Sequence, residues 1–390
     1  MYSSELKAEL MLRASKIQEK MKANGVDACL IAGNANLYYI SDRVFRGYVY
    51  IEQQGEPIYF VIRPVGLKGT NVVYIRKPEQ IAEELANRNI AAPQKIGLEL
   101  DWLTFNDAKR LSSVFPNSEV VNSTMVLKGA RMVKTDVEVA KMREDGVHQT
   151  KAYSKVPEIY KEGMTDLEFQ IELERILRLE GSIGFARVSG HLMEINLGSV
   201  LNGENADSPT PFDFAVGGTG VNKSLPVGAN GEVMRKGTTV MVDMNGNFNG
   251  HQTDITRVWR FGKVDEMTEK AHEVSRQILR EMEKMGVPGC KVADMYNRAM
   301  EIVEQHGLTD YFMGHTQKAA FIGHGVCIEL NEMPVLTPRS KDVLEKNMTI
   351  AIEPKFVVPG VGAVGVENTY LVTNNGLENL TPFPEEMAEL

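Results

Sequence analysis

One segment, residues 240–260 (VMVDMNGNFNGHQTDITRVWR), constrains what this chain can fold into more than any other. A run of β-forming residues leads into Asp243, the polar pair Asn249-Gly250 follows, and a second such run returns through Asp254. Asn-Gly between two such runs predicts a β-hairpin with a type I′ turn, which needs positive φ at both central positions. We therefore expect two antiparallel strands joined at Asn249-Gly250.

The register of this hairpin brings two carboxylates together. With the turn at these two residues, Asp243 faces Thr256 and Asn245 faces Asp254. Because side chains alternate between the faces of a strand, Asp243 and Asp254 share one face. As diagonal neighbours their Cα atoms are about 7–8 Å apart. Two acids directed into the same space repel each other unless a cation lies between them, so the hairpin predicts a metal site.

Length and composition limit the class of protein. The 390 residues exceed the usual single-core limit of about 250–300, so two domains are expected. A hydrophobic content of 43% and a net charge of −9 are typical of a soluble cytosolic protein and argue against a nucleic-acid-binding surface. The chain has no run of 18 apolar residues and no apolar signal segment at its start, so no membrane partner is expected.

The cysteines support the same compartment. Cys29, Cys290 and Cys327 are far apart and form neither a C-x-x-C pair nor an even disulfide framework. That usage suits a reducing compartment, so the predicted location is cytoplasmic.

The first part of the chain alternates helical and strand patterns. An amphipathic helix is expected over 4–24, ended by Asn24-Gly25, followed by short strands at 27–33 and 37–42. Residues 49–63 predict a hairpin around Gln54-Gly55, and 71–75 and 95–100 predict strands with a helix at 79–89 between them. Strands alternating with helices indicate a mixed α/β domain over 1–126.

The second domain is expected over 127–390 and makes the whole chain an α/β (α+β) protein. Two capping boxes, Thr135 with Glu138 and Thr165 with Glu168, predict helix starts. Helices are also expected over 265–285 and 292–306, and strands over 321–330, 348–358 and 362–373. The Gly-, Asn- and Pro-rich residues 188–231 indicate long loops that could form a wall of a site.

Three more candidate ligands follow the aspartates. His324 lies between two glycines, which let the backbone approach a ligand closely, although such a histidine is more often a turn residue. Glu353 ends the alternating run MTIAIEP, where a glutamate is usually just solvated. Glu367 lies inside an apolar strand, where an unpaired carboxylate costs on the order of several kcal/mol, so it requires a partner.

The five residues together are oxygen-rich ligands with one imidazole. Such a set suits Mn, Fe, Co or Zn, and two ions sharing carboxylates about 3.5–4 Å apart. With these five residues in this order and spacing, the chain resembles the superfamily of methionine aminopeptidases, Xaa-Pro aminopeptidases, prolidases and creatinases. The resemblance rests on four segments: VDMNGNFNGHQTDITR (242–257), GHGVCIELNEMP (323–334), IEPKF (352–356) and VGVENTYLVT (364–373).

The resemblance implies a creatinase-type N-terminal domain, a pita-bread catalytic domain and two divalent ions. Asp243 and Asp254 would hold one ion, and Asp254, His324, Glu353 and Glu367 the other. A hydroxide bridging the ions would attack a peptide carbonyl, often one preceding proline, with Glu353 as the base. Creatinase lacks the metals, so its metal-free reaction is not expected here. The resemblance also implies a homodimer.

Four positions depart from the peptidase pattern. Val227 and Ala320 stand where relatives have histidines, Asn331 replaces the histidine of a His-Glu pair, and Gly365 replaces an arginine. In peptidases these side chains hold the substrate carbonyl, the tetrahedral intermediate or the proline end. Loss of one oxyanion donor typically costs about 10²–10³ in rate. Asn331 can still donate a hydrogen bond and is kept as a catalytic candidate.

Other histidines could replace the missing ones. His191, His251 and His315 are available, but the sequence does not place them in the site. Cys327, three residues after His324, is close enough in sequence to line the site, although a core position is expected for it.

Three hypotheses remain open. The first is a dinuclear-metal-dependent hydrolase resembling Xaa-Pro aminopeptidases and dipeptidases. The second is a metal enzyme acting on a small molecule, either an amidohydrolase or a lyase similar to the dimethylsulfoniopropionate lyases of the superfamily. The third is a metal-binding protein without turnover.

Overall fold

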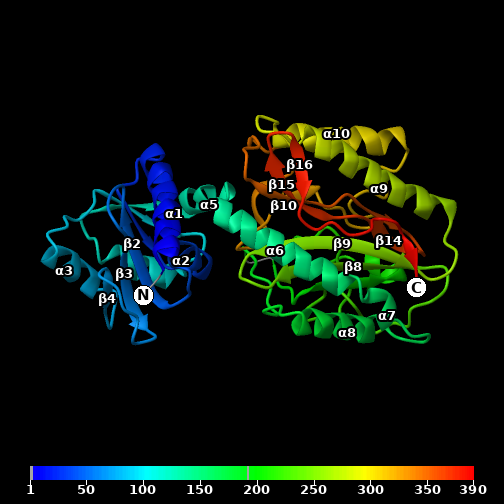
Figure 1. Ribbon diagram of the computed structural model, residues 1–390, viewed down its shortest axis with the longest axis horizontal. Coiled ribbons are helices and arrows are strands. Elements are labelled where there is room, and N and C mark those ends of the chain that lie inside the picture. The colour runs from blue at the N-terminus through cyan, green and yellow to red at the C-terminus, as the bar shows by residue number, and fades with distance from the viewer. Residues whose placement is uncertain (1–2, 191–192) are drawn as a thin grey trace. The chain divides into compact units, whose positions relative to one another are not determined.

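The computed structural model describes residues 3–190 and 193–390, and its Cα positions separate into two compact units, Met1–Arg131 and Met132–Leu390. The first unit contains a six-stranded mixed sheet in the order β4-β3-β2-β1-β5-β6 (Figure 1). Its strands are β1 (Ala28–Ile31), β2 (Arg46–Glu52), β3 (Ile58–Arg63), β4 (Val72–Tyr74), β5 (Lys95–Leu98) and β6 (Glu119–Asn122). The expected mixed α/β character is therefore confirmed.

The helices of the first unit are α1 (Ser4–Ala23), α2 (Asn34–Ser41), α3 (Gln80–Asn87) and α4 (Phe105–Ser112). The helix α5 (Thr124–Met132) follows them, and the first unit ends at its last residue but one, Arg131. Helix α1 ends at Asn24, and Gly25 has φ 64° as the expected left-handed cap. The expected strand at 37–42 is wrong, because this segment belongs to helix α2. A short apolar run has too few residues for its periodicity to separate a buried helix from a strand.

The described residues of the second unit form three sheets. A four-stranded sheet has the order β17-β9-β8-β7, a five-stranded sheet has the order β11-β10-β12-β15-β16, and β13 pairs with β14. The first of these comprises β7 (Gly198–Asn202), β8 (Thr239–Asn247), β9 (Gln252–Arg260) and β17 (Ala388–Glu389). The second comprises β10 (Gly323–Gly325), β11 (Glu332–Val335), β12 (Thr349–Ile352), β15 (Asn368–Thr373) and β16 (Gly376–Asn379). The pair is β13 (Lys355–Val358) with β14 (Gly362–Gly365).

Helices cover both sides of these strands (Figure 1). Helices α6 (Asp136–Tyr153), α7 (Val156–Ile159) and α8 (Asp166–Leu179) form one layer, and α9 (Glu266–Met285) and α10 (Val292–Gln305) form the other. Both expected capping boxes are present, at the starts of α6 and α8. The helices expected over 265–285 and 292–306 are likewise confirmed as α9 and α10.

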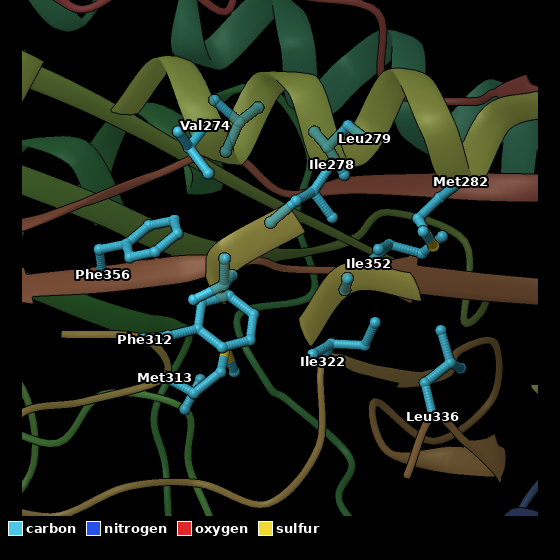
Figure 2. Close-up of a cluster of buried hydrophobic side chains, with 14 of the residues drawn as sticks. Val274, Ile278, Leu279, Met282, Phe312, Met313, Ile322, Leu336, Ile352 and Phe356 are labelled. Carbon is cyan, nitrogen blue, oxygen red and sulfur yellow. The ribbon is translucent and has the colours of Figure 1, made fainter. Parts of the chain in front are cut away.

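Helix α9 packs against the strands that carry part of the candidate site. Figure 2 shows its apolar side chains directed toward those of the segments around residues 312, 322, 352 and 356. The labelled members of this cluster are Val274, Ile278, Leu279, Met282, Phe312, Met313, Ile322, Leu336, Ile352 and Phe356. All of them are at most 4% exposed, so β12 and β13 pack against a buried apolar core formed with α9.

The hairpin β8–β9 has the predicted register. Asp243 pairs with Thr256, and Asn245 pairs with Asp254. The expected type I′ turn is wrong, because of the two turn residues only Gly250 has a positive φ (86°). The loop spans four residues, since the last pair is Asn247 with Gln252, and a longer loop does not need positive φ at both central positions.

Candidate metal centre

One face of β8 packs in the apolar core and the other faces the candidate site. Val240, Val242 and Met244 pack in the apolar cluster with α6, α7 and α8. Asp243 and Asn245 therefore point to the opposite side, where both line a cavity of about 550 Å³. The strict alternation of β8 is what directs a carboxylate into this cavity.

Asp254 reaches the same place from β9 of the same sheet, and the other three candidates come from the five-stranded sheet or from residues next to its strands. Strand β10 pairs antiparallel with β12, so that His324 lies opposite Ala351 and close to Glu353, which follows β12. Glu367 lies between β14 and β15 and forms an isolated bridge with Thr256 of β9. Asp243, Asp254, His324 and Glu353 line the cavity, while Glu367 is only 1% exposed. The fold thus gathers all five predicted residues.

His324 presents one nitrogen to the carboxylates. Its Nδ1 lies 3.1 Å from the carbonyl oxygen of Gly325, and since a carbonyl only accepts, Nδ1 carries a hydrogen, so Nε2 is the nitrogen that can coordinate an ion. Nε2 is 3.5 Å from Glu353 Oε1 and 4.0 Å from Asp254 Oδ2. Two atoms that each lie about 2.1 Å from a shared ion are roughly 3–4 Å apart, so this spacing is that of a ligand group.

Asp254, His324 and Glu367 form one group whose ligand atoms all lie within 4.8 Å of one another. Within residues 3–190 and 193–390, the buried Glu367 Oε1 has no hydrogen-bond partner. The backbone of Asp254 is fixed by Thr369, whose hydroxyl accepts from Asp254 N at 2.7 Å and donates to Asp254 O at 2.9 Å. An unpartnered buried carboxylate oxygen beside an imidazole nitrogen fits a bound divalent cation.

Asp243, Glu353 and Glu367 form a second group, and Lys355 contacts all three. Its Nζ lies 2.7 Å from Asp243 Oδ2, 2.6 Å from Glu353 Oε2 and 3.0 Å from Glu367 Oε2. Sequence reasoning missed this lysine. The available signal was a cationic residue opening the apolar strand KFVV, which requires a partner for the same reason as Glu367.

Burial and charge shift the pKa values in this centre. Burial raises the pKa of Asp254 well above its ordinary value, and the nearby Glu367 and Asp243 carboxylates raise it further. Burial also raises the pKa of Asp243, which the Lys355 ammonium partly offsets. Burial by itself lowers the pKa of Lys355, but the surrounding carboxylates outweigh it and raise that pKa well above its ordinary value. The carboxylates therefore need cations in order to be ionised together.

The four positions that depart from the peptidase pattern lie in different parts of the second unit. Asn331 lines the cavity, where its amide accepts from Ser189 N at 2.6 Å and donates to Ser189 O at 2.7 Å. Ala320 also lines it, whereas Val227 is not among the described lining residues. Gly365 pairs with Lys355, and a Cβ there would lie 2.6 Å from Pro354 O. The arginine that the resemblance expects at 365 therefore has no space.

The two spare histidines that the structure describes, His251 and His315, do not replace the missing ones. His251 is fully buried, with Nε2 4.0 Å from Glu138 Oε1, and His315 is exposed and stacks on Tyr311. Neither is among the described residues that line the cavity, and His191 lies outside the described residues. Cys327 is buried near Glu138 and His251. The three cysteines form no disulfide with one another.

Carboxylates and an imidazole gathered at the wall of a cavity fit the centre of a metal-dependent hydrolase. The profile of metallopeptidase family M24 matches residues 140–374, and that of the Creatinase/Prolidase N-terminal domain matches residues 13–133. The chain belongs to metallopeptidase family M24. It is thus a hydrolase of the pita-bread fold with a creatinase-type N-terminal domain, as the resemblance implied.

Relatives match along nearly the whole chain. The Xaa-Pro dipeptidase of Pyrococcus furiosus is 26% identical over 384 residues, which cover 96% of this chain and 99% of that protein. Among solved structures, the Xaa-Pro dipeptidase from Bacillus anthracis has a TM-score of 0.80 at 21% identity, over 98% of this chain and 100% of that one. The X-Pro aminopeptidase from Thermotoga maritima has a TM-score of 0.78 at 20% identity, over 97% and 99%. These structures share the fold.

Proposed function

We propose that this protein hydrolyses short Xaa-Pro-type peptides with a divalent ion held by Asp254, His324 and Glu367. The observation that carries the proposal is the convergence of these three side chains beside Glu353, with Asp254, His324 and Glu353 at the wall of the cavity and Glu367 buried behind them. A divalent ion bound there supplies a Lewis acid that polarises a carbonyl and acidifies water. The ions that suit this set are Mn, Co, Zn or Fe.

The cavity supports a small peptide as substrate. Its volume of about 550 Å³ lies in the range of small-molecule sites, roughly 300–1,000 Å³. Phe212, Phe214 and Phe321 offer apolar surface to a proline ring, and Lys318 offers a positive charge to a terminal carboxylate. Glu353 faces the cavity and is the group that would take a proton from the attacking water and return it to the leaving amine.

Asn331 both fixes the cavity wall and contacts the substrate in this proposal. One of its amide hydrogens and its oxygen are already bound to Ser189, so the side chain fixes the loop at the cavity wall. The second amide hydrogen is free to reach the substrate carbonyl, which is the donor function that the sequence assigned to it.

The test is hydrolysis of Xaa-Pro dipeptides and tripeptides with added Mn²⁺ or Co²⁺. We expect turnover that falls by at least about 10² in Glu353→Gln, because that change removes the proton carrier while keeping the shape. Glu304→Gln, an exposed change on α10, is the matched control and keeps full activity. Turnover of none of these peptides contradicts the peptidase proposal.

A non-peptide substrate is the competing reading, and one observation favours it. The side chains expected at 320 and 365 are absent, and the second position has no space for an arginine. If the peptides are not turned over, release of product from small amides or from dimethylsulfoniopropionate identifies the amidohydrolase or lyase alternative. A centre that binds metal and turns over neither class is the non-catalytic alternative.

We also propose that the protein is a cytoplasmic homodimer. The cysteine usage and the net charge of −9 support the compartment, and the family resemblance supports the dimer. Within the described part of the chain, all helices are too short or too polar to cross a membrane. Light scattering after size-exclusion chromatography gives the mass in solution, and a monomer contradicts the dimer proposal.

A further inference from the structure

Lys355 lies where a cation between Asp243, Glu353 and Glu367 would lie. Its Nζ contacts one oxygen of each, at 2.7, 2.6 and 3.0 Å. These three carboxylates come from β8, from the end of β12 and from the segment before β15. The Lys355 ammonium therefore binds carboxylates from three separate parts of the fold, unlike the single partner of a surface ion pair.

The backbone of Lys355 is held by neighbouring strands, and its side chain has space to reach the carboxylates. Lys355 opens β13 and pairs with Gly365 of β14, and its carbonyl oxygen accepts from Met313 N at 2.8 Å. A Cβ on Gly365 would lie 2.9 Å from Lys355 Cα and 3.4 Å from its Cγ, so the absence of a side chain there leaves space for the stem. The whole residue is 1% exposed. Lys355 is therefore held at both ends, by its backbone partners and by the three carboxylates.

We propose that Lys355 replaces one of two divalent ions, so that the centre binds a single metal ion. An ion bound by Asp243, Glu353 and Glu367 would have to lie about 2.0–2.2 Å from their oxygens. Nζ already lies between the same oxygens, and two cations cannot share that space. The ammonium satisfies the carboxylates with charge and hydrogen bonds.

The remaining charges still require one ion. Four carboxylates meet one ammonium, and Asp254 is not among the contacts that Lys355 makes. Asp254, His324 and Glu367 form the other group, and Glu367 Oε1 has no hydrogen-bond partner within the described residues. Glu367 is thus shared between the ammonium and the ion. An ammonium cannot accept a lone pair. Lys355 therefore neutralises negative charge in its half of the centre, but it cannot coordinate a substrate oxygen or a water as a metal ion would.

The experiment measures Mn²⁺ bound per chain, by calorimetry and elemental analysis, in the full-length protein. We expect one ion in the wild type and two in Lys355→Ala, which vacates the second position. Lys134→Ala is the matched control, since Lys134 is also buried and paired, but its ammonium contacts Glu332 Oε2 at 3.1 Å rather than any of the five candidate ligands. It keeps a stoichiometry of one.

Two ions in the wild type overturn the inference, as does a folded Lys355→Ala that still binds one. If that variant does not fold, the anomalous map of wild-type crystals grown with Mn²⁺ decides the question. One peak beside Asp254, His324 and Glu367 supports the inference, and a second peak beside Asp243 overturns it.

The inference rests on the proposed metal site but not on the proposed substrate. A stoichiometry of one with no peptide hydrolysis leaves it standing and removes only the peptidase. A wild type that binds no Mn²⁺ overturns both the metal site and the inference.

Discussion

Asp145 shows how a single buried carboxylate can link stability to pH. Residing on α6, it accepts from Phe248 N at 2.6 Å in the hairpin loop, and Thr253 Oγ1 lies 2.8 Å from its other oxygen. The Thr253 hydroxyl is also 2.7 Å from Gln149 Oε1 and has one hydrogen to give. Burial raises the pKa of Asp145 from 3.8 to about 7, so a protonated Asp145 can donate to Thr253.

The expected consequence is a loss of stability as pH rises. Between 3.8 and about 7 the folded chain holds a proton that the unfolded chain has released. The free energy of unfolding therefore falls by up to about 1.4 kcal/mol per pH unit in that window. Asp145→Asn keeps the shape and both hydrogen bonds without the titration, so its stability does not fall in this way. Urea unfolding of both proteins at pH 5 and pH 7 measures the difference, and parallel pH dependence contradicts the assignment.

Helix α6 carries a glycine whose small size is required by its neighbour. A Cβ on Gly146 would lie 2.0 Å from the carbonyl oxygen of Leu380. Helix propensity alone predicts that alanine stabilises this position by roughly 1 kcal/mol. Because the obstacle is backbone, we expect the opposite, a loss of about 1–3 kcal/mol in Gly146→Ala.

The matched control is Gly129 on α5, where the nearest atoms to an added Cβ are 3.8 Å away in the flexible Lys20 side chain. Gly129→Ala should be neutral or stabilise by up to about 1 kcal/mol. Thermal and urea midpoints give both effects. A shift in the same direction for both variants would mean that propensity, not packing, decides at Gly146.

At the scale of the whole molecule, metal binding should stabilise one unit. All the candidate ligands lie in Met132–Leu390. At an Mn²⁺ concentration of about 100 times Kd, binding adds about 2.7 kcal/mol to the free energy of unfolding. Hydrogen exchange of core amides in β8, β9, β12 and β15 should slow by about 100-fold.

The six-stranded sheet of Met1–Arg131 serves as the internal control and should exchange at an unchanged rate. Equal slowing of amides in β1 and β5 would contradict a site built from the second unit. Chelation of the ion should return the exchange rates to those of the metal-free protein.

The sequence by itself determined the local elements and the register of the β8–β9 hairpin. Capping boxes, apolar periodicity and turn residues act over a few neighbouring positions, so they are readable before the chain folds. The same local signals failed where they were weak or ambiguous. The apolar run at 37–42 is too short for its periodicity to distinguish a helix from a strand. The strand expected over 348–358 is divided after Ile352 into β12 and β13, which belong to different sheets.

Only the tertiary structure decided how the candidate ligands are shared among cations. Lys355 and Asp243 are 112 positions apart in the chain, and their contact depends on strands β13 and β8 of two different sheets coming together. Apolar periodicity shows that Lys355 and Glu367 are buried, but it cannot show that they meet. That pairing is electrostatic and non-local, because a buried charge takes whichever opposite charge the completed fold places beside it.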